Sequence, residues 1–197
     1  MNLKTVLFWG GLGLAAMASG IGWTAWTVKR PDTVAISAGP WRAHLLAGSV
    51  AADNVTRARV AVGGLLALGP EETIYYVART DSSGRDLRSR CEYRIEGVKP
   101  DARWWSITAY ADDHFLFADA QQHFSINGAR IKTDAQGRFV ARSSPSDQTA
   151  DGQSPDMRTP GDRGLVFTLR LYNPSDTLQK DPGTLDAPRI ESVGVCS

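Results

Sequence analysis

Cysteine, histidine and the usual catalytic motifs are scarce in this chain of 197 residues. There are two cysteines and three histidines, with no Cys-x-x-Cys or His-Glu-x-x-His spacing of the kind that binds zinc. A Gly-x-Ser-x-Gly nucleophile elbow is also missing. We therefore predict no metal site and no cofactor, and the sequence does not favour a nucleophilic hydrolase.

Excess charge of either sign is lacking as well. The 22 basic and 21 acidic residues give a net charge of +1. Proteins that bind nucleic acids need a basic surface to neutralise phosphates. The composition therefore excludes a typical nucleic-acid partner, and no internal repeats or low-complexity tracts suggest a repeat protein.

Acidic residues gather near two of the histidines without forming a recognisable ligand pattern. The group comprises Asp112, Asp113, His114, Asp119 and His123. Aspartates in turns are usually solvated, so we do not predict a metal ion here. A carboxylate pair for glycoside hydrolysis stays open, because such pairs are defined in space and not by sequence spacing.

The N-terminal segment, residues 1–30, is predicted to be a transmembrane anchor. Residues 5–28 carry no charge, and as a helix they would be roughly 36 Å long at about 1.5 Å per residue, enough to cross a hydrocarbon core of about 30 Å. Lys4 and Lys29 flank the segment, and Trp23 and Trp26 suit a membrane interface.

A cleaved signal peptide is the alternative, because Ala16, Met17 and Ala18 resemble a cleavage site. We favour the uncleaved anchor, since apolar residues continue beyond that site. Charges on the two sides are nearly even and leave the orientation open. We expect Cys91 to pair with Cys196, which an oxidising compartment permits; two unpaired buried cysteines are the alternative. The pairing favours a single-pass protein of the inner (cytoplasmic) membrane with a periplasmic domain.

The remaining chain divides into a linker at residues 31–52 and a mainly β domain at residues 53–197. Within the linker we expect a short element at residues 41–46. Asp53 is predicted to cap a short amphipathic helix over residues 54–68. The strands expected after it have the spacing of a sandwich or barrel. They span residues 73–80, 91–96, 103–110, 115–117, 123–126, 129–133, 138–143, 164–172 and 189–196, with residues 144–162 and 173–188 as loops.

Alternation in two of these strands predicts one core face and one face for function. Trp105, Ile107 and Ala109 are expected in the core, as are the odd-numbered residues 165–171. The other faces carry aromatic rings, hydroxyls and one arginine, which suit a polar, sugar-like ligand. The candidate ligand-binding residues are Trp104, Ser106, Thr108, Tyr110, Arg170 and Tyr172. A half-buried outer face whose polar groups satisfy neighbouring loops is the structural alternative.

Three sequence blocks resemble a known family, domain of unknown function family 1214. They are residues 66–75 (LALGPEETIY), 105–110 (WSITAY) and 167–172 (FTLRLY), and the resemblance covers residues 53–195. It implies a jelly-roll-like antiparallel β-sandwich. It also implies a partner, because this domain is often fused to, or paired with, unknown-function family 1254, which we would then expect on a separate protein.

Together these features predict a membrane-anchored module of the cell envelope that binds a polar or carbohydrate-like ligand or a partner domain. The alternative is a hydrolase or related enzyme acting on a carbohydrate-like envelope component. The missing catalytic signatures favour the binding module.

Overall fold

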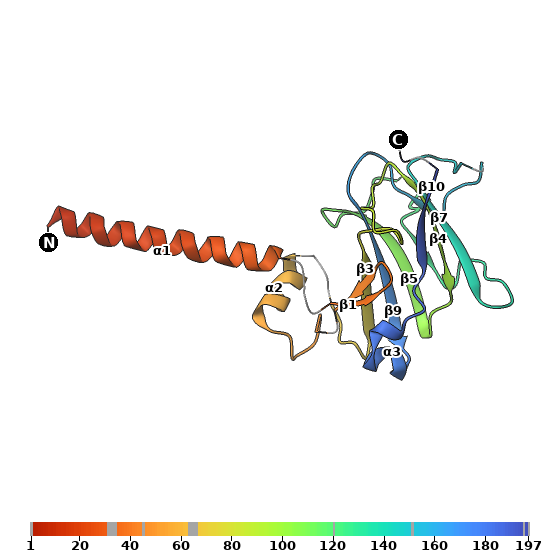
Figure 1. Cartoon of the computed structure of the whole chain (residues 1–197), viewed down its shortest axis with the longest axis horizontal. Helices are drawn as coiled ribbons and strands as arrows, with labels where there is room; N and C mark the ends of the chain where they lie inside the picture. The colour runs from red at the N-terminus through yellow and green to blue at the C-terminus, as the bar shows by residue number, and fades with distance from the viewer. Residues whose placement is uncertain are drawn as a thin grey trace.

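A computed structural model describes residues 2–30, 35–44, 46–62, 67–119, 121–150, 152–194 and 196. Two sheets form the β domain, and an isolated helix precedes it (Figure 1). The larger sheet has the strand order β1-β2-β3-β9-β5-β6 and the smaller one β10-β4-β7-β8. All described strand pairs are antiparallel except β7 with β8. The mainly β, two-sheet prediction is therefore confirmed.

The helices and strands follow one another along the chain in a single order. Their bounds are α1 Leu3–Lys29, β1 Ile36–Ala38, β2 Trp41–Ala43, α2 Asn54–Val62, β3 Thr73–Ala78, β4 Glu92–Val98, β5 Ala102–Ala111, β6 Ser125–Asn127, β7 Arg138–Ser144, β8 Met157–Arg158, β9 Leu165–Pro174, α3 Asp176–Lys180, the 3-10 helix η1 Pro182–Thr184 and β10 Arg189–Val193.

The core lies between the two sheets and is built from the inward positions of their strands. Trp105 of β5 and Phe139 of β7 bring their ring centroids to 4.8 Å, and Tyr93 of β4 contacts Phe167 of β9 edge-on at 6.1 Å. Trp105, Ile107 and Ala109 are all buried, as are the odd-numbered residues 165–171. The predicted core faces of both strands are therefore confirmed, because alternation fixes which residues meet the opposite sheet.

Helix α1 is long and apolar enough to cross a membrane, and none of its residues is buried against the protein. N-terminal signal sequences share this length and composition. Helix α2 begins after Asp53, whose carboxylate accepts a hydrogen bond from the Thr56 N–H at 2.7 Å. That cap confirms the predicted helix start.

The described part of the apolar face of α2 is only partly covered, since Val55 and Ala58 are half-buried. Val62 is 74% exposed, and Thr56 is the one buried residue among those described in the helix. The helix was predicted to reach residue 68. Its described part is Asn54–Val62, residues 67 and 68 are not helical, and residues 63–66 lie outside the described part of the chain.

A hairpin occupies part of the predicted linker. Strands β1 and β2 turn at Gly39, whose φ of +59° suits glycine, and β2 pairs with β3. Trp41 is fully buried and donates its indole N–H to the Pro188 carbonyl at 2.7 Å. This burial explains why residues 31–52 contribute two strands to the larger sheet.

Other strand predictions were wrong in detail because the segments make only single bridges. Residues 115–117 join β5 through the pair Tyr110–Leu116 alone, and residues 129–133 join β7 through Thr133–Phe139 alone. The last strand ends at Val193, short of the predicted residue 196.

The expected loops contain further elements: β8 lies within residues 144–162, and α3 and η1 lie within residues 173–188. Leu178 of α3 is buried, so packing supports a helix too short to show periodicity.

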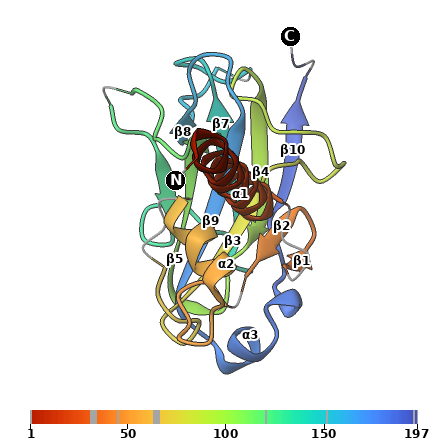
Figure 2. The same ribbon diagram turned by 90° about the vertical axis from the view of Figure 1, so that its left-hand side faces the viewer.

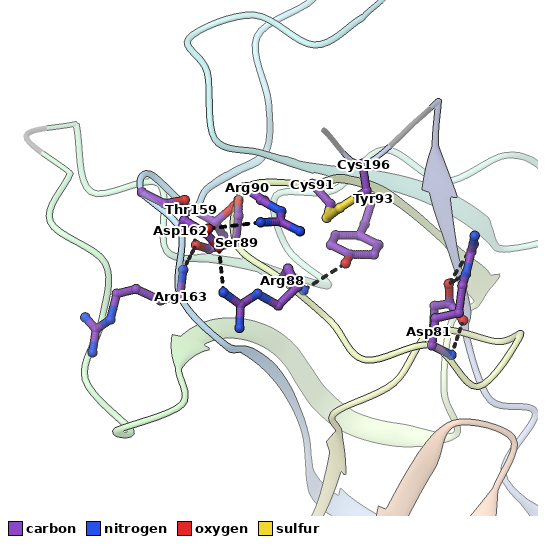
Figure 3. Close-up of a disulfide and its surroundings, with 12 residues drawn as sticks. Asp81, Arg88, Ser89, Arg90, Cys91, Tyr93, Thr159, Asp162, Arg163 and Cys196 are labelled. Atoms are coloured by element: carbon purple, nitrogen blue, oxygen red, sulfur yellow. Dashed lines mark hydrogen bonds and ion pairs between the residues drawn. A yellow bond between two sulfur atoms is a disulfide. The ribbon is translucent and has the colours of Figure 1, made fainter.

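A disulfide joins Cys91 to Cys196 across 105 residues of sequence (Figure 3). It fastens the segment after β10 to the start of β4, and Cys91 itself is buried. Nearby, Asp162 accepts hydrogen bonds from Arg88 at 2.6 Å and from Arg90 at 3.0 Å. Those hydrogen bonds, Arg88's first, hold the pKa of the Asp162 carboxyl below its usual value.

Removing the disulfide should destabilise the fold. Replacing both cysteines by serine releases a closed loop of 105 residues, and the free energy of unfolding should fall by about 2–5 kcal/mol in a denaturant titration. Alkylation of the unreduced native protein should find no free thiol and, after reduction, two. Two reactive thiols before reduction would contradict the bridge.

Candidate functional site

The outward faces of β5 and β9 lie side by side on the larger sheet. The antiparallel register pairs Trp104 with Tyr172, Ser106 with Arg170 and Thr108 with Thr168. Residues directly opposite one another in a sheet point to the same side. The candidate residues Trp104, Ser106, Thr108, Tyr110, Arg170 and Tyr172 therefore share one face, which we call the outer face. On this face Ser106 and Thr108 are buried, Trp104 is exposed, and the other three are half-buried.

Arg170 is the central charge of the outer face. Its guanidinium donates to the Thr108 hydroxyl at 3.3 Å and to the Tyr110 hydroxyl at 3.0 Å, and it lies 5.5 Å from the centroid of the Tyr110 ring. These partners are neutral, and no carboxylate among the described residues pairs with it. A half-buried cation without a counter-ion is unfavourable. The arrangement favours an anionic group as an additional partner.

An aromatic pair adjoins this arginine. The Trp104 and Tyr172 rings meet edge to face with centroids 5.1 Å apart, and Trp104 is 40% exposed. Thr73 of β3 continues this row beside Tyr172. Its buried hydroxyl has no hydrogen-bond partner among the described residues. Exposed tryptophan rings are suitable stacking surfaces for the apolar face of a sugar ring.

Strand β3 adds residues that the sequence pattern did not select. Tyr75 lies opposite Arg170 and Val77 opposite Thr168, and Asn127 of β6 lies opposite Ser106. The alternation of residues 73–77 predicts which of their side chains share one face of the strand. That this face lies beside Arg170 became clear only from the strand order, in which β3 borders β9.

The outward side of the smaller sheet is chemically different. Its central rows pair Arg189 with Glu96 and Glu191 with Arg94, and ion pairs join Arg94 to Glu96 and Arg189 to Glu191. Such a ladder of opposite charges is typical of a solvated surface. Between residues 104–110, 166–172 and 73–77, by contrast, the outward positions carry one charge, Arg170. On the neighbouring strand β2, Arg42 lies on the same side, opposite Val77.

The acidic residues near the histidines are separated by other partners. Asp113 pairs with Arg163; a hydrogen bond from the Phe115 N–H, then the Arg163 contact, lowers the pKa of its carboxyl. Burial, with Arg79 nearby, lowers the pKa of His114. In the described ranges, no three histidine, cysteine or acidic side chains are placed to share a metal ion.

Asp119 and His123 form a second polar group at the edge between the sheets. The buried Asp119 carboxylate accepts the His123 backbone N–H at 2.7 Å and lies 3.8 Å from the Arg158 guanidinium. The His123 imidazole remains 3.9 Å from the same carboxylate, which is too long for a hydrogen bond. This group holds the loop after β5 against β8, since Arg158 also donates its backbone N–H to the His123 carbonyl.

Two surface depressions lie away from the outer face. The larger, of about 720 Å³, borders β4 and β7 and is lined by residues such as Val98, Arg138 and Phe139. The smaller, of about 300 Å³, lies beside α3 and η1 and includes Lys99, Asp101 and Thr184. The outer face is thus a sheet surface on which aromatic, hydroxyl and guanidinium groups lie together, away from both depressions. The carboxylate pair expected of a glycosidase does not occur on its paired strand positions.

Comparisons with known proteins agree with the fold. The family model described as Protein of unknown function (DUF1214) matches residues 72–176, more than half of the chain. None of the curated proteins compared with the chain matches it.

Two solved structures are similar to this chain. The VPA0106 protein from Vibrio parahaemolyticus has a TM-score of 0.58 and 22% identity over 73% of this chain and 36% of its own. A putative uncharacterized protein from Burkholderia cenocepacia has a TM-score of 0.37 and 14% identity over 62% of this chain and 29% of its own. The present chain thus spans about a third of either neighbour's length, and the first likeness concerns the fold alone.

Arg170 should contribute little to folding stability if its role is binding. Arg170→Gln removes a charge that lacks a counter-ion, so the free energy of unfolding should stay within about 1 kcal/mol or rise. Trp105→Ala is the control and should cost about 3–5 kcal/mol by opening a cavity. A loss of about 2 kcal/mol or more for Arg170→Gln would assign the arginine a structural role instead.

Proposed function

The chain belongs to the family described as Protein of unknown function (DUF1214), and because that description names no activity, we propose a function from the site itself. The protein is a membrane-anchored module of the cell envelope that binds an anionic, carbohydrate-like ligand on the outer face. The observation that carries this proposal is Arg170: half-buried, held by two neutral hydroxyls and without a carboxylate partner in the described residues.

The ligand class follows from the groups around this arginine. A guanidinium makes charge-assisted hydrogen bonds to phosphate or carboxylate. Ser106, Thr108 and Thr168 are buried polar residues on the same face, and Trp104 supplies a partly exposed ring. An anionic group on Arg170 with a polyol or sugar ring against Trp104 satisfies both parts of the face.

Two features of the chain, helix α1 and the disulfide, support the proposed anchor and compartment. Helix α1 has the length and composition of a membrane span, and the disulfide between Cys91 and Cys196 suits an oxidising compartment. We place the β domain outside the cytoplasm on these grounds, with α1 retained as the anchor.

Binding can be tested with the detergent-solubilised full chain on an array of neutral and acidic glycans. We expect retention of phosphate- or uronate-bearing sugars and at least tenfold weaker retention by Arg170→Gln, a loss of about 1.4 kcal/mol or more in binding free energy. Arg42→Gln is the matched control, because Arg42 lies on the same sheet and donates to Ser37 at 2.8 Å. Equal retention by all three proteins, or none by any, would contradict the proposal.

A further inference from the structure

The outer face is turned toward the side from which α1 projects. In Figure 1 the strands β1, β3, β9 and β5 lie nearer α1 than β4, β7 and β10 do, and Figure 2, seen along α1, shows α2 in front of β3, β5 and β9. The charged surface of the smaller sheet therefore faces away from α1. A membrane that held α1 would therefore lie on the same side of the β domain as α2 and the outer face.

Contacts at the end of α1 support this arrangement. Arg59 of α2 donates to the carbonyls of Thr27 at 3.0 Å and Val28 at 3.3 Å, the last turn of α1. These carbonyls lack partners within the helix, so a cationic side chain is favourable there. The Arg30 guanidinium also lies 3.7 Å from the centroid of the Trp26 ring, a pairing suited to the membrane interface.

Exposed apolar side chains mark the same side. Beyond α1, the segment around α2 leaves Val50 at 95%, Val62 at 74% and Leu68 at 41% exposed. On the outward side of the smaller sheet, the large apolar side chain described as exposed is that of Val140, with an exposed fraction of 36%. Apolar groups near a bilayer surface are sheltered by the interface, whereas ion pairs such as Arg94 with Glu96 suit open water.

We propose that the outer face recognises the headgroup of an anionic glycolipid, one with a polyol or sugar ring attached to phosphate, presented by the membrane that holds α1. This inference rests on the proposed function and names the source of its ligand. Arg170 binds the phosphate, and Trp104 with Tyr172 packs against the ring. The charged side of the smaller sheet remains in solvent.

Orientation is tested with single labels on the full chain in lipid nanodiscs. Both native cysteines are joined in the disulfide, so an added cysteine can be labelled selectively. Ser125→Cys places a fluorophore on the outer face, where Ser125 is exposed opposite Thr108, and Val140→Cys places it on the smaller sheet. A trace of lipid with a nitroxide on its headgroup should quench the first label at least threefold more than the second.

Recognition is tested with phosphatidylinositol, whose headgroup joins a phosphate to a polyol ring, against phosphatidylglycerol and phosphatidylcholine. Native mass spectrometry of the full chain released from discs should show phosphatidylinositol retained at least fivefold over either competitor. Arg170→Gln and Trp104→Ala should each remove that preference, while Arg42→Gln should keep it. Thermal melts of each variant show whether it is folded.

The outcomes separate the two proposals. Equal quenching at both labels, or no preference for phosphatidylinositol, overturns the glycolipid assignment even if acidic glycans bind the solubilised chain. If the outer face lies close to the membrane but no glycan on the array is retained, a free sugar is excluded as the ligand. The lipid-borne ligand is then supported only if retention of phosphatidylinositol depends on Arg170. Retention that does not depend on Arg170 overturns both.

Discussion

The pairing of β5 with β9 is the constraint on which the core and the candidate site both depend. These are the two ten-residue strands of the larger sheet, and nine residue pairs align them from Ala102–Pro174 to Ala111–Leu165. Because successive side chains alternate, a slip of one residue would exchange every inward and outward position. Burial of Trp105 and Leu171 between the sheets therefore also fixes Trp104 and Arg170 on the outer face.

The outward sides of the two sheets differ in how their charged side chains are paired, so the two sides of the sandwich are chemically distinct. On the smaller sheet Arg94 pairs with Glu96 and Arg189 with Glu191. Arg170 instead has hydroxyl partners and no counter-ion among the described residues. Natural sequences tolerate such unfavourable local chemistry mainly where function requires it. Contacts of Arg59 with the last turn of α1 place α1 on the side of the outer face, and under our proposal this is the side that faces the membrane.

The sequence predicted the long elements and the disulfide, and it missed features that depend on neighbours. Alternation was enough for β5 and β9, and two cysteines leave one possible bridge. Residues 36–43 gave too short a signal for a hairpin, which exists because Trp41 is buried and bonded to Pro188. Strand order places Tyr75 beside Arg170 and Thr73 beside Tyr172, and the lack of a described counter-ion follows from the whole set of contacts. Neither can be deduced from local pattern.

The most direct measurement of the central claim is the NMR signal of the Arg170 guanidinium in the full chain. Its Nε–H resonance, assigned by comparison with Arg170→Gln, can be followed during titration with glycerophosphoinositol, the water-soluble headgroup of phosphatidylinositol. The account predicts a saturable shift for Arg170 and none for Arg42, which is bonded to Ser37 on the same sheet. An unmoved Arg170 signal beside saturable shifts of Arg94 or Arg189 would place binding on the smaller sheet and contradict the account.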